Sequence, residues 1–343
     1  MNATARRTLT VALVVAAVVV AVLALWELRV LIMLLFFAFT VAAAMRPSVE
    51  ALSRKRVPPV AAILLHYAAL AGLISLLLWA VVQRAVDQVQ AALGDAKDET
   101  GFKGEVLGWL NQRLERLPRV EELFDPALEL TLLGFEIALG IFFVFACAAY
   151  WIYERNDAVR LVSSLIPQDH RKTVTDTWDL IDLKLGAYVR GQALLILLVA
   201  TVLSICFWAI GLPFWLLIAV FAGVVEIIPV IGPLTAGALA VGVGFTESVG
   251  VGIAAGVIVL VVRLLEDYLV IPRVLGDAVG LSPLLVIVSV AATAILFGEV
   301  DVLLAIPLAA VLATLFEVVV LERDPAEQEV PTVLFPAQDA ETR

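Results

Sequence analysis

The sequence contains few charged residues, and most of those are acidic. Only 16% of its 343 residues are charged, with 23 Lys and Arg against 33 Asp and Glu and a formal net charge of -10. A nucleic-acid-binding protein needs a basic face that neutralises phosphates. This composition therefore argues against nucleic acid as a partner.

Cysteine and histidine are also scarce. Cys147 and Cys206 both lie in apolar segments, so we expect two small buried side chains, with neither a disulfide framework nor a metal site. His66 and His170 are the only histidines, and no zinc or serine-nucleophile motif accompanies them. A phosphate-binding GxxxxGK(S/T) loop is absent as well, which argues against direct ATP drive. We expect no cofactor and no enzymatic activity.

Apolar residues, by contrast, fill most of the chain. They make up 62% of the sequence, and the mean hydropathy is +1.02. A bilayer core of about 30 Å needs roughly 20 helical residues, and runs of that order recur. The sequence predicts an all-α integral membrane protein in contact with the lipid bilayer, with its first five spans near residues 9–25, 30–45, 60–82, 132–153 and 192–210.

The distribution of Lys and Arg predicts the orientation of these spans. Basic residues cluster at 6–7, 46–56 and 155–172, which places those segments in the cytoplasm. Residues 84–131 then lie outside. A charged start before an apolar run also describes a signal peptide, but the second run follows too closely and favours an antiparallel hairpin. We expect an inner-membrane, multi-pass protein with both termini cytoplasmic.

The chain divides into five segments on this interpretation. Residues 84–131 carry an amphipathic helix that rests on the bilayer, forms its own bundle or contacts another subunit. After the fourth span, Asp169 can cap a cytoplasmic collar helix in which Trp178 and Leu185 share an apolar stripe while Asp179 and Asp182 face away. The segments are three spans at 1–83, the outer helix at 84–131, the fourth span and collar helix at 132–191, a transport core at 192–322, and a disordered tail at 323–343.

One stretch, "VVEIIPVIGPLTAG" at 224–237, interrupts the apolar pattern. Residues 213–245 would measure about 50 Å as one helix, far longer than a span. Pro229 and Pro233 each lack an amide hydrogen, and Gly232 between them allows a turn. We therefore expect two half-length helices, at 213–228 and 234–245, that meet at a break deep in the protein.

Glu226 lies one turn before this break. A carboxylate near the centre of a bilayer costs about 2.5 to 3.5 kcal/mol on insertion scales, and broken backbone is tolerated at that depth only beside protein or water. The combination is typical of a transport site that binds a cation or exchanges a proton. The alternative is that Glu226 only satisfies the broken backbone or pairs with Arg263.

A second irregular unit follows the apolar run that begins at Gly250. Glu266, Asp267 and Arg273 surround Pro272, and we place all four with Arg263 in the transport pathway. Beyond them, residues 283–297 and 302–321 form two apolar arms around "GEVD" at 298–301. These arms are either two full spans or a second re-entrant hairpin, and the sequence leaves both open.

Several of these stretches resemble the autoinducer-2 exporter family of bacterial permeases. The resemblance is carried by "YWIYERNDAVRLVSSLIP" at 150–167, "YVRGQALL" at 188–195, "EIIPVIGP" at 226–233, "EDYLVIPRVLGDAVGLSPLLV" at 266–286 and "ILFGEVDVLLAIPLAAVL" at 295–312. The family's motif residues fall here on Ile228, Pro229, Val230, Ile231, Gly232 and Pro233, and on Pro272, Arg273, Gly276, Gly280, Leu281 and Pro283. Three positions depart from the family's pattern: Glu226 lies where aspartate is frequent, Tyr268 where asparagine is frequent and Asp301 where glycine is common.

The resemblance implies about eight membrane segments, a homo-oligomer, and export or exchange of a small solute. Our first hypothesis is a secondary transporter of a small solute that resembles autoinducer-2, with a broken-helix site formed by Glu226, Pro229, Gly232 and Pro233. The alternatives are a sodium or potassium/proton antiporter of the same family and a membrane scaffold that transports nothing. The solute, the coupling ion and the subunit number are not determined by the sequence.

Overall fold

The computed structural model describes residues 3–95, 124–228, 231–274, 280–328 and 330, and every regular element in those ranges is a helix. Most of the predicted outer segment at 84–131 lies outside these ranges, and so does Pro229. The helices are α1 (Ala3–Glu27), α2 (Arg29–Arg54), α3 (Pro59–Asp95), α5 (Phe124–Ser164), α6 (Gln168–Ala209), α7 (Trp215–Val225), α8 (Ile231–Glu247), α9 (Val249–Leu265), η2 (Glu266–Val270), α10 (Ile271–Val274), α11 (Pro283–Leu296), η3 (Val300–Leu304), α12 (Ala305–Val319) and η4 (Pro325–Glu327).

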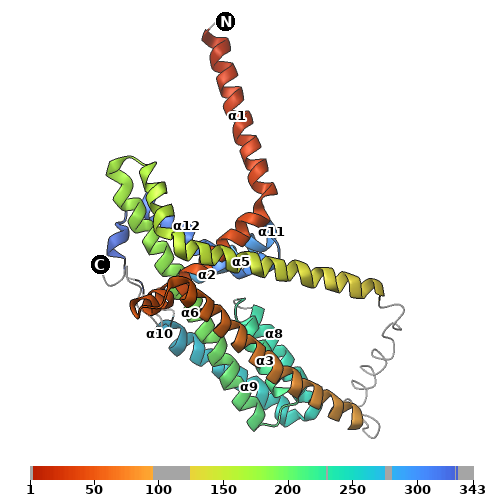
Figure 1. Cartoon of the computed structure of the whole chain (residues 1–343). Coiled ribbons are helices and arrows are strands. Elements are labelled where there is room, and N and C mark those ends of the chain that lie inside the picture. Colours follow the sequence, from red (N-terminus) through yellow and green to blue (C-terminus); the bar gives the residue numbers. More distant parts are fainter. Residues whose placement is uncertain (1–2, 96–123, 229–230, 275–279, 329, 331–343) are drawn as a thin grey trace.

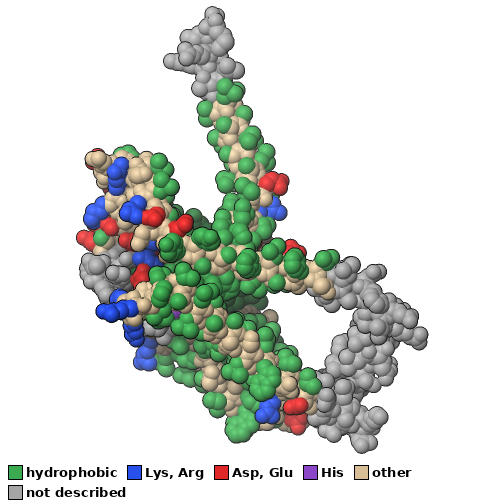
Figure 2. All heavy atoms as spheres, viewed as in Figure 1, with side chains coloured by type: hydrophobic (Ala, Val, Ile, Leu, Met, Phe, Trp, Pro, Cys, Tyr) green, Lys and Arg blue, Asp and Glu red, His purple; other side chains and the backbone are tan. Residues whose placement is uncertain are grey.

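Within the described residues, six helical stretches are long and apolar enough to cross a bilayer, and four shorter apolar helices accompany them. Apolar side chains cover the sides of the long helices, while charged side chains gather mainly near the turn between α5 and α6 and at other helix ends (Figure 2). Lipid can solvate such a surface and water cannot. The expectation of an all-α membrane protein is confirmed.

Helix α6 lies at the centre of the arrangement. It packs against α2, α5 and α12 with one part of its length and against α7 and α9 with another. Helix α1 projects away from the other helices and contacts mainly α2, while α3 and α5 extend as long arms (Figure 1). One continuous helix therefore contacts both groups of neighbouring helices.

The structure corrects the predicted collar helix, because that segment and the fifth span are one continuous helix. α6 has 42 residues, about 63 Å at 1.5 Å per residue. Gly186 lies where the sequence suggested a division, but it permits a close approach to α2 instead: a Cβ there would overlap the Ala43 carbonyl oxygen. Pro167, not Asp169, occupies the N-cap position, and Asp169 lies in the first turn.

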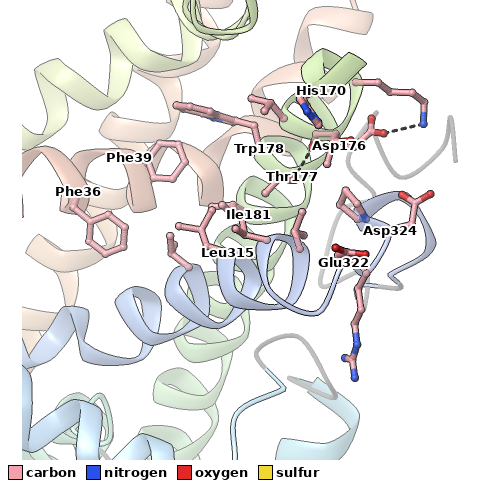
Figure 3. A pocket seen from close by; sticks show the side chains of 18 of the residues that line it. Phe36, Phe39, His170, Asp176, Thr177, Trp178, Ile181, Leu315, Glu322 and Asp324 are labelled. Carbon is pink, nitrogen blue, oxygen red and sulfur yellow. Dashed lines mark hydrogen bonds and ion pairs between the residues drawn. The ribbon is translucent and has the colours of Figure 1, made fainter. Parts of the chain in front are cut away.

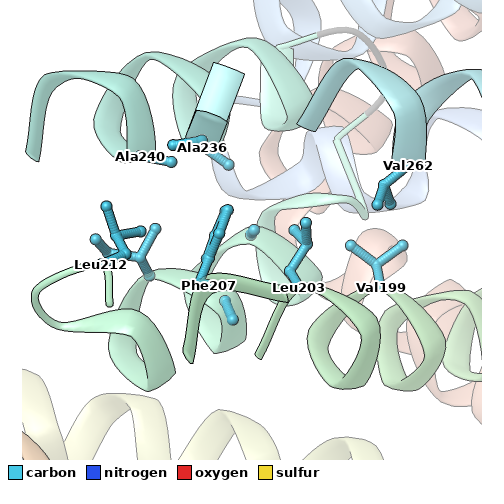
Figure 4. Close-up of a cluster of buried hydrophobic side chains, with 11 residues drawn as sticks. Val199, Leu203, Phe207, Leu212, Ala236, Ala240 and Val262 are labelled. Carbon is cyan, nitrogen blue, oxygen red and sulfur yellow. The ribbon is translucent and has the colours of Figure 1, made fainter. Parts of the chain in front are cut away.

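The predicted break after Glu226 is present. α7 ends at Val225 and α8 begins at Ile231, so two helices of 11 and 17 residues replace one long helix. Their apolar faces pack on α6 and α9 through a buried cluster in which Leu203 and Phe207 of α6 face Ala236 and Ala240 of α8 (Figure 4). This core holds the ends of α7 and α9 beside each other.

The C-terminal part of the chain returns to α6. α11 has 14 residues and packs against α12; at about 21 Å it is shorter than a bilayer core. After α12 the chain forms η4, and Lys184 Nζ donates to the side chains of Thr314 and Gln328 at 3.1 and 2.9 Å. The predicted disordered tail therefore does not begin at residue 323, because residues 325–328 are held against α6. Residues 331–343 lie outside the described ranges.

Candidate functional site

Glu226 lies at the end of α7 and contacts α9. Its side chain is only 8% exposed, and its Oε1 accepts a hydrogen bond from Arg263 Nη1 at 2.7 Å. The ion pair that the sequence left as an alternative thus exists. Glu226 is not the only partner of Arg263, which also binds two further carboxylates.

Those two carboxylates belong to the first residues after α9. Arg263 Nη1 lies 3.3 Å from Glu266 Oε2, and Arg263 Nη2 lies 2.9 Å from Asp267 Oδ1. The exposed fraction of the side chain rises from 3% at Glu266 to 40% at Asp267. One guanidinium group therefore faces three carboxylates that range from fully buried to exposed. We call these four side chains the Arg263 cluster.

The position of Glu266 depends on a local change in helix type. The Ile271 amide donates to the Glu266 carbonyl, five residues earlier, so η2 is a turn of π-helix. Pro272 has no amide hydrogen to continue the α-helical ladder, which accounts for the wider turn. Such turns occur frequently at functional sites. Glu266 Oε1 is buried and has no hydrogen-bond partner within the described part of the chain.

A small cavity of about 20 Å³ adjoins the cluster. Glu226, Arg263 and Glu266 line it together with Pro233 of α8 and apolar side chains of α6, α7 and α9. A cavity of this size holds about one water molecule. The backbone at the break is also contacted from α6, because Gln192 Nε2 donates to the Glu226 carbonyl oxygen at 3.2 Å.

Gly232 is needed at the break for a reason other than the one predicted. It lies in the first turn of α8 without a positive φ, and its amide donates to the Ile228 carbonyl at 2.9 Å. A Cβ at this position would overlap the Val225 carbonyl oxygen. The glycine therefore allows two backbone segments to approach closely, and it does not form the turn itself.

The remaining predicted site residues lie further out. Pro272 and Arg273 are exposed on α10 and do not line the small cavity. Tyr268 is 76% exposed and does not line the small cavity either. The structure thus brings together Glu226, Pro233, Arg263, Glu266 and Asp267, and it separates Pro272 and Arg273 from them.

Sequence reasoning missed a second buried ionic cluster, which joins α2, α5 and α6. Arg155 Nε donates to Asp182 Oδ2 at 2.7 Å, and Arg155 Nη2 donates to Asp179. Arg46 Nη1 lies 3.3 Å from the same Asp182 oxygen and its Nε lies 2.6 Å from Glu50. Asp182 is only 5% exposed, so the side of α6 that was expected to face away from the apolar stripe is itself packed against α2 and α5. We call these five residues the Arg155 cluster.

The histidines play no part in either cluster. His66 Nδ1 is within 2.7 Å of the Ala62 carbonyl, one turn away on α3, which satisfies it locally. Among the residues that the structure describes, no group of three or more His, Cys, Asp or Glu side chains is arranged to hold a metal ion. The carboxylates of the Arg263 cluster thus converge on a guanidinium and do not form a set of metal ligands.

Broken and continuous apolar helices around a buried ionic cluster define a multi-span membrane protein. The sequence profile described as "AI-2E family transporter" matches residues 13–321. The chain belongs to this family, which confirms the resemblance drawn from the sequence motifs.

Three bacterial relatives are each named "Putative transport protein". The chain is similar to YrrI of Bacillus subtilis (26% identity, covering 59% of each chain), to YueF of the same organism (29% identity, covering 49% of this chain and 45% of YueF), and to MT0215 of Mycobacterium tuberculosis (30% identity, covering 49% and 44%). The alignments thus span about half the length of these relatives. A role in membrane transport is supported at this level.

Proposed function

We propose that the protein is a secondary transporter in which the Arg263 cluster couples solute movement to the movement of a proton. The observation that carries this proposal is the arrangement of Glu226 and Glu266, two buried carboxylates that share one guanidinium beside a helix break. The solute is a small molecule of the autoinducer-2 kind, and the direction is export or exchange. No enzymatic activity is part of the proposal.

The charge balance of the cluster favours a coupling role. Glu226 and Glu266, if both were ionised, would leave one uncompensated negative charge in a buried place against the single guanidinium of Arg263, and buried uncompensated charge is strongly unfavourable. A proton on one carboxylate or a bound cation removes part of this excess. Because the carboxylates are not arranged as metal ligands, we favour the proton and place it on Glu266, whose Oε1 has no partner in the described residues.

The surroundings allow this proton to be exchanged. The cavity next to Glu226 and Glu266 has room for about one water molecule, which can accept a hydrogen bond from a protonated Oε1. Asp267 is 40% exposed and shares Arg263, so it connects the buried pair to the surface. The broken backbone between α7 and α8 adds polar groups that no continuous helix would offer.

We also propose the topology that the sequence predicts. The protein spans the bacterial inner membrane several times, with both termini in the cytoplasm. α11 and α12 form a re-entrant hairpin, because α11 is too short to span a bilayer unaided. The chains assemble as a homo-oligomer. An antiporter that exchanges sodium or potassium for protons uses the same cluster and is the second candidate function; a scaffold that transports nothing is the third.

The test is transport by purified protein in liposomes that contain the pH indicator pyranine. One measurement adds sodium or potassium outside and follows the internal pH; the other follows autoinducer-2 uptake under an imposed pH gradient. We expect Glu226→Gln and Glu266→Gln to abolish the dependence on the pH gradient, because glutamine retains the shape but cannot exchange a proton. Glu154→Gln, an exposed change on α5, serves as the control.

Each outcome separates the candidate functions. Cation-driven pH change without autoinducer-2 uptake favours the antiporter, and uptake that depends on the pH gradient favours the solute transporter. If the folded parent protein shows neither of these activities, the result supports the scaffold. Gradient-driven transport by Glu226→Gln and Glu266→Gln equal to that of the parent would contradict the coupling role of the cluster.

A further inference from the structure

A second, much wider cavity lies near the start of α6, away from the Arg263 cluster. Its volume is about 1390 Å³, and it is lined by α2, α5, α6, α12 and the chain that leads to η4 (Figure 3). Trp178 on its wall precedes Gln192 on α6 by 14 residues, about 21 Å along the helix. Drug-sized molecules occupy pockets of roughly 300–1,000 Å³, so this cavity can admit one. We call it the wide cavity.

Aromatic side chains form one wall of the wide cavity. The rings of Trp151 and Trp178 are stacked, with centroids 5.7 Å apart and an interplanar angle of 23°. Phe39 meets both edge-on, at 5.2 Å from Trp151 and 6.3 Å from Trp178. All three line the cavity. The faces of tryptophan rings carry negative electrostatic potential and attract organic cations.

Trp178 also offers an unused hydrogen-bond donor. Its Nε1 is shielded from solvent and finds no acceptor among the described residues. Buried tryptophan N–H groups normally have a partner, and an unsatisfied donor is unfavourable. Because no solute atom can reach Nε1 in this conformation, the indole of Trp178 has to rotate to bring Nε1 into the wide cavity, where a carbonyl, ether or hydroxyl oxygen of a solute then supplies the missing acceptor.

The mouth of the wide cavity is acidic. Its two basic side chains are already paired: Lys172 Nζ lies 3.0 Å from Asp176, and Arg323 Nη1 lies 3.1 Å from Glu317. The charged and titratable side chains that line the mouth are Asp169, His170, Lys172, Asp176, Glu322, Arg323 and Asp324. Acidic groups exceed basic ones in this set, which attracts cations and repels anions.

We propose that the wide cavity binds an organic cation with an aromatic or apolar body and an oxygen acceptor. The aromatic wall stabilises the cationic group, and the acidic mouth raises the local concentration of the cation. Trp178 Nε1 donates to the oxygen once its indole has rotated toward the ligand. That such a molecule is also carried across the membrane rests on the proposed transport function. The binding of the molecule to the wide cavity does not rest on that function.

The test is a comparison of two probes that differ in charge and share a shape. Benzoylcholine has a phenyl ring, an ester carbonyl and a trimethylammonium group; 3,3-dimethylbutyl benzoate replaces the nitrogen with carbon and is neutral. Each is titrated into the full chain in non-ionic detergent and the heat is measured by calorimetry, with protein-free micelles as the blank. We expect benzoylcholine to bind about tenfold more tightly than the neutral ester.

Three variants assign this binding to the wide cavity. Trp178→Phe keeps a ring but removes the donor, and should weaken benzoylcholine binding about fivefold. Glu322→Gln with Asp324→Asn should weaken it about threefold at low salt, with little difference at high salt. Trp208→Phe, on the same helix but 65% exposed and outside the cavity, should leave it unchanged.

Equal affinity for the two probes would overturn the proposal and indicate an apolar cavity filled by lipid. Absence of benzoylcholine binding to folded parent protein would overturn it as well, and so would equal weakening by Trp178→Phe and Trp208→Phe. These results are independent of the liposome assays. Loss of coupling in Glu226→Gln with intact benzoylcholine binding would support both proposals, whereas binding without any transport would contradict only the transport function.

Discussion

The Arg155 cluster and the Arg263 cluster are built from the same kinds of side chain in different proportions. The Arg155 cluster sets two guanidiniums, of Arg46 and Arg155, against three carboxylates, and both guanidiniums reach one oxygen of Asp182. The Arg263 cluster sets one guanidinium against three carboxylates, beside a cavity and a helix break. The first is closer to neutrality and joins three continuous helices. The second retains an excess of negative charge where backbone and side chains have room to change.

This difference indicates different roles for the two clusters. Asp182 Oδ1, like Glu266 Oε1, is buried without a hydrogen-bond partner among the described residues, but two guanidiniums bind Asp182 Oδ2 and favour its charged form. Removal of a guanidinium from that cluster mainly exposes an uncompensated charge. A cluster with excess charge changes its protonation or its partner when the surroundings change. We therefore assign structural integrity to the Arg155 cluster and coupling to the Arg263 cluster.

The largest expected effect on stability is at Arg155. Arg155→Met leaves Asp182 buried with only Arg46 as a partner, and should lower the free energy of unfolding by about 3–5 kcal/mol. The measurement is unfolding of the purified protein by titration with denaturing detergent, followed by tryptophan fluorescence.

Replacement of both partners provides the matched control for Arg155. Arg155→Met with Asp182→Leu removes the two charges together and should recover much of the lost stability. Arg263→Met should cost less than Arg155→Met, because Arg263 is 30% exposed and Arg155 only 7%. A larger loss of stability at Arg263 would reverse the assignment of roles.

Gly232 offers a test of the helix break. Gly232→Leu should abolish transport while the protein still inserts, and Gly232→Ala should impair it severely, because even a Cβ overlaps the Val225 carbonyl. Gly242→Ala, on the same helix with open space around it, is the control. Transport by Gly232→Leu at the parental rate in liposomes would show that the break is irrelevant to function.

The smallest effect is expected at Asp267. Its carboxylate is 40% exposed, and exposed ion pairs contribute about 0–1 kcal/mol. Asp267→Asn should therefore change the transport rate by at most about fivefold and retain the dependence on the pH gradient. Glu226→Asp should likewise retain partial function, since the carboxylate persists on a shorter stem. Complete uncoupling by Asp267→Asn would place the titrating group at Asp267 instead of Glu266.

The sequence predicted the features of this protein that depend on local chemistry. Runs of apolar residues predicted the membrane helices, and the prolines around Gly232 predicted the division into α7 and α8. The pairing of Glu226 with Arg263 was recognised as an alternative because both are charged residues in apolar segments. The neighbourhood of Glu266 and Pro272 was also recognised as irregular, although its π-helical form was not.

Features that depend on contacts between distant helices were not predictable from one sequence. The Arg155 cluster joins residues 136 positions apart in the chain, and nothing in the pattern around Asp182 distinguishes it from an exposed acid. The sequence pattern suggested two helices where α6 is continuous, and the close approach of Gly186 to α2 is a tertiary contact that the pattern does not reveal. The contact of Gln192 with the Glu226 carbonyl has the same origin in tertiary packing.

The central claim is that the Arg263 cluster holds an exchangeable proton and the Arg155 cluster does not. Infrared difference spectroscopy of the protein in lipid, between acidic and alkaline buffer, detects the carbonyl stretch of a protonated buried carboxyl group directly. The parent should lose such a band as the pH rises, Glu266→Gln should lack it, and Asp182→Asn should retain it unchanged. A band that survives in Glu266→Gln and disappears in Asp182→Asn would contradict the account.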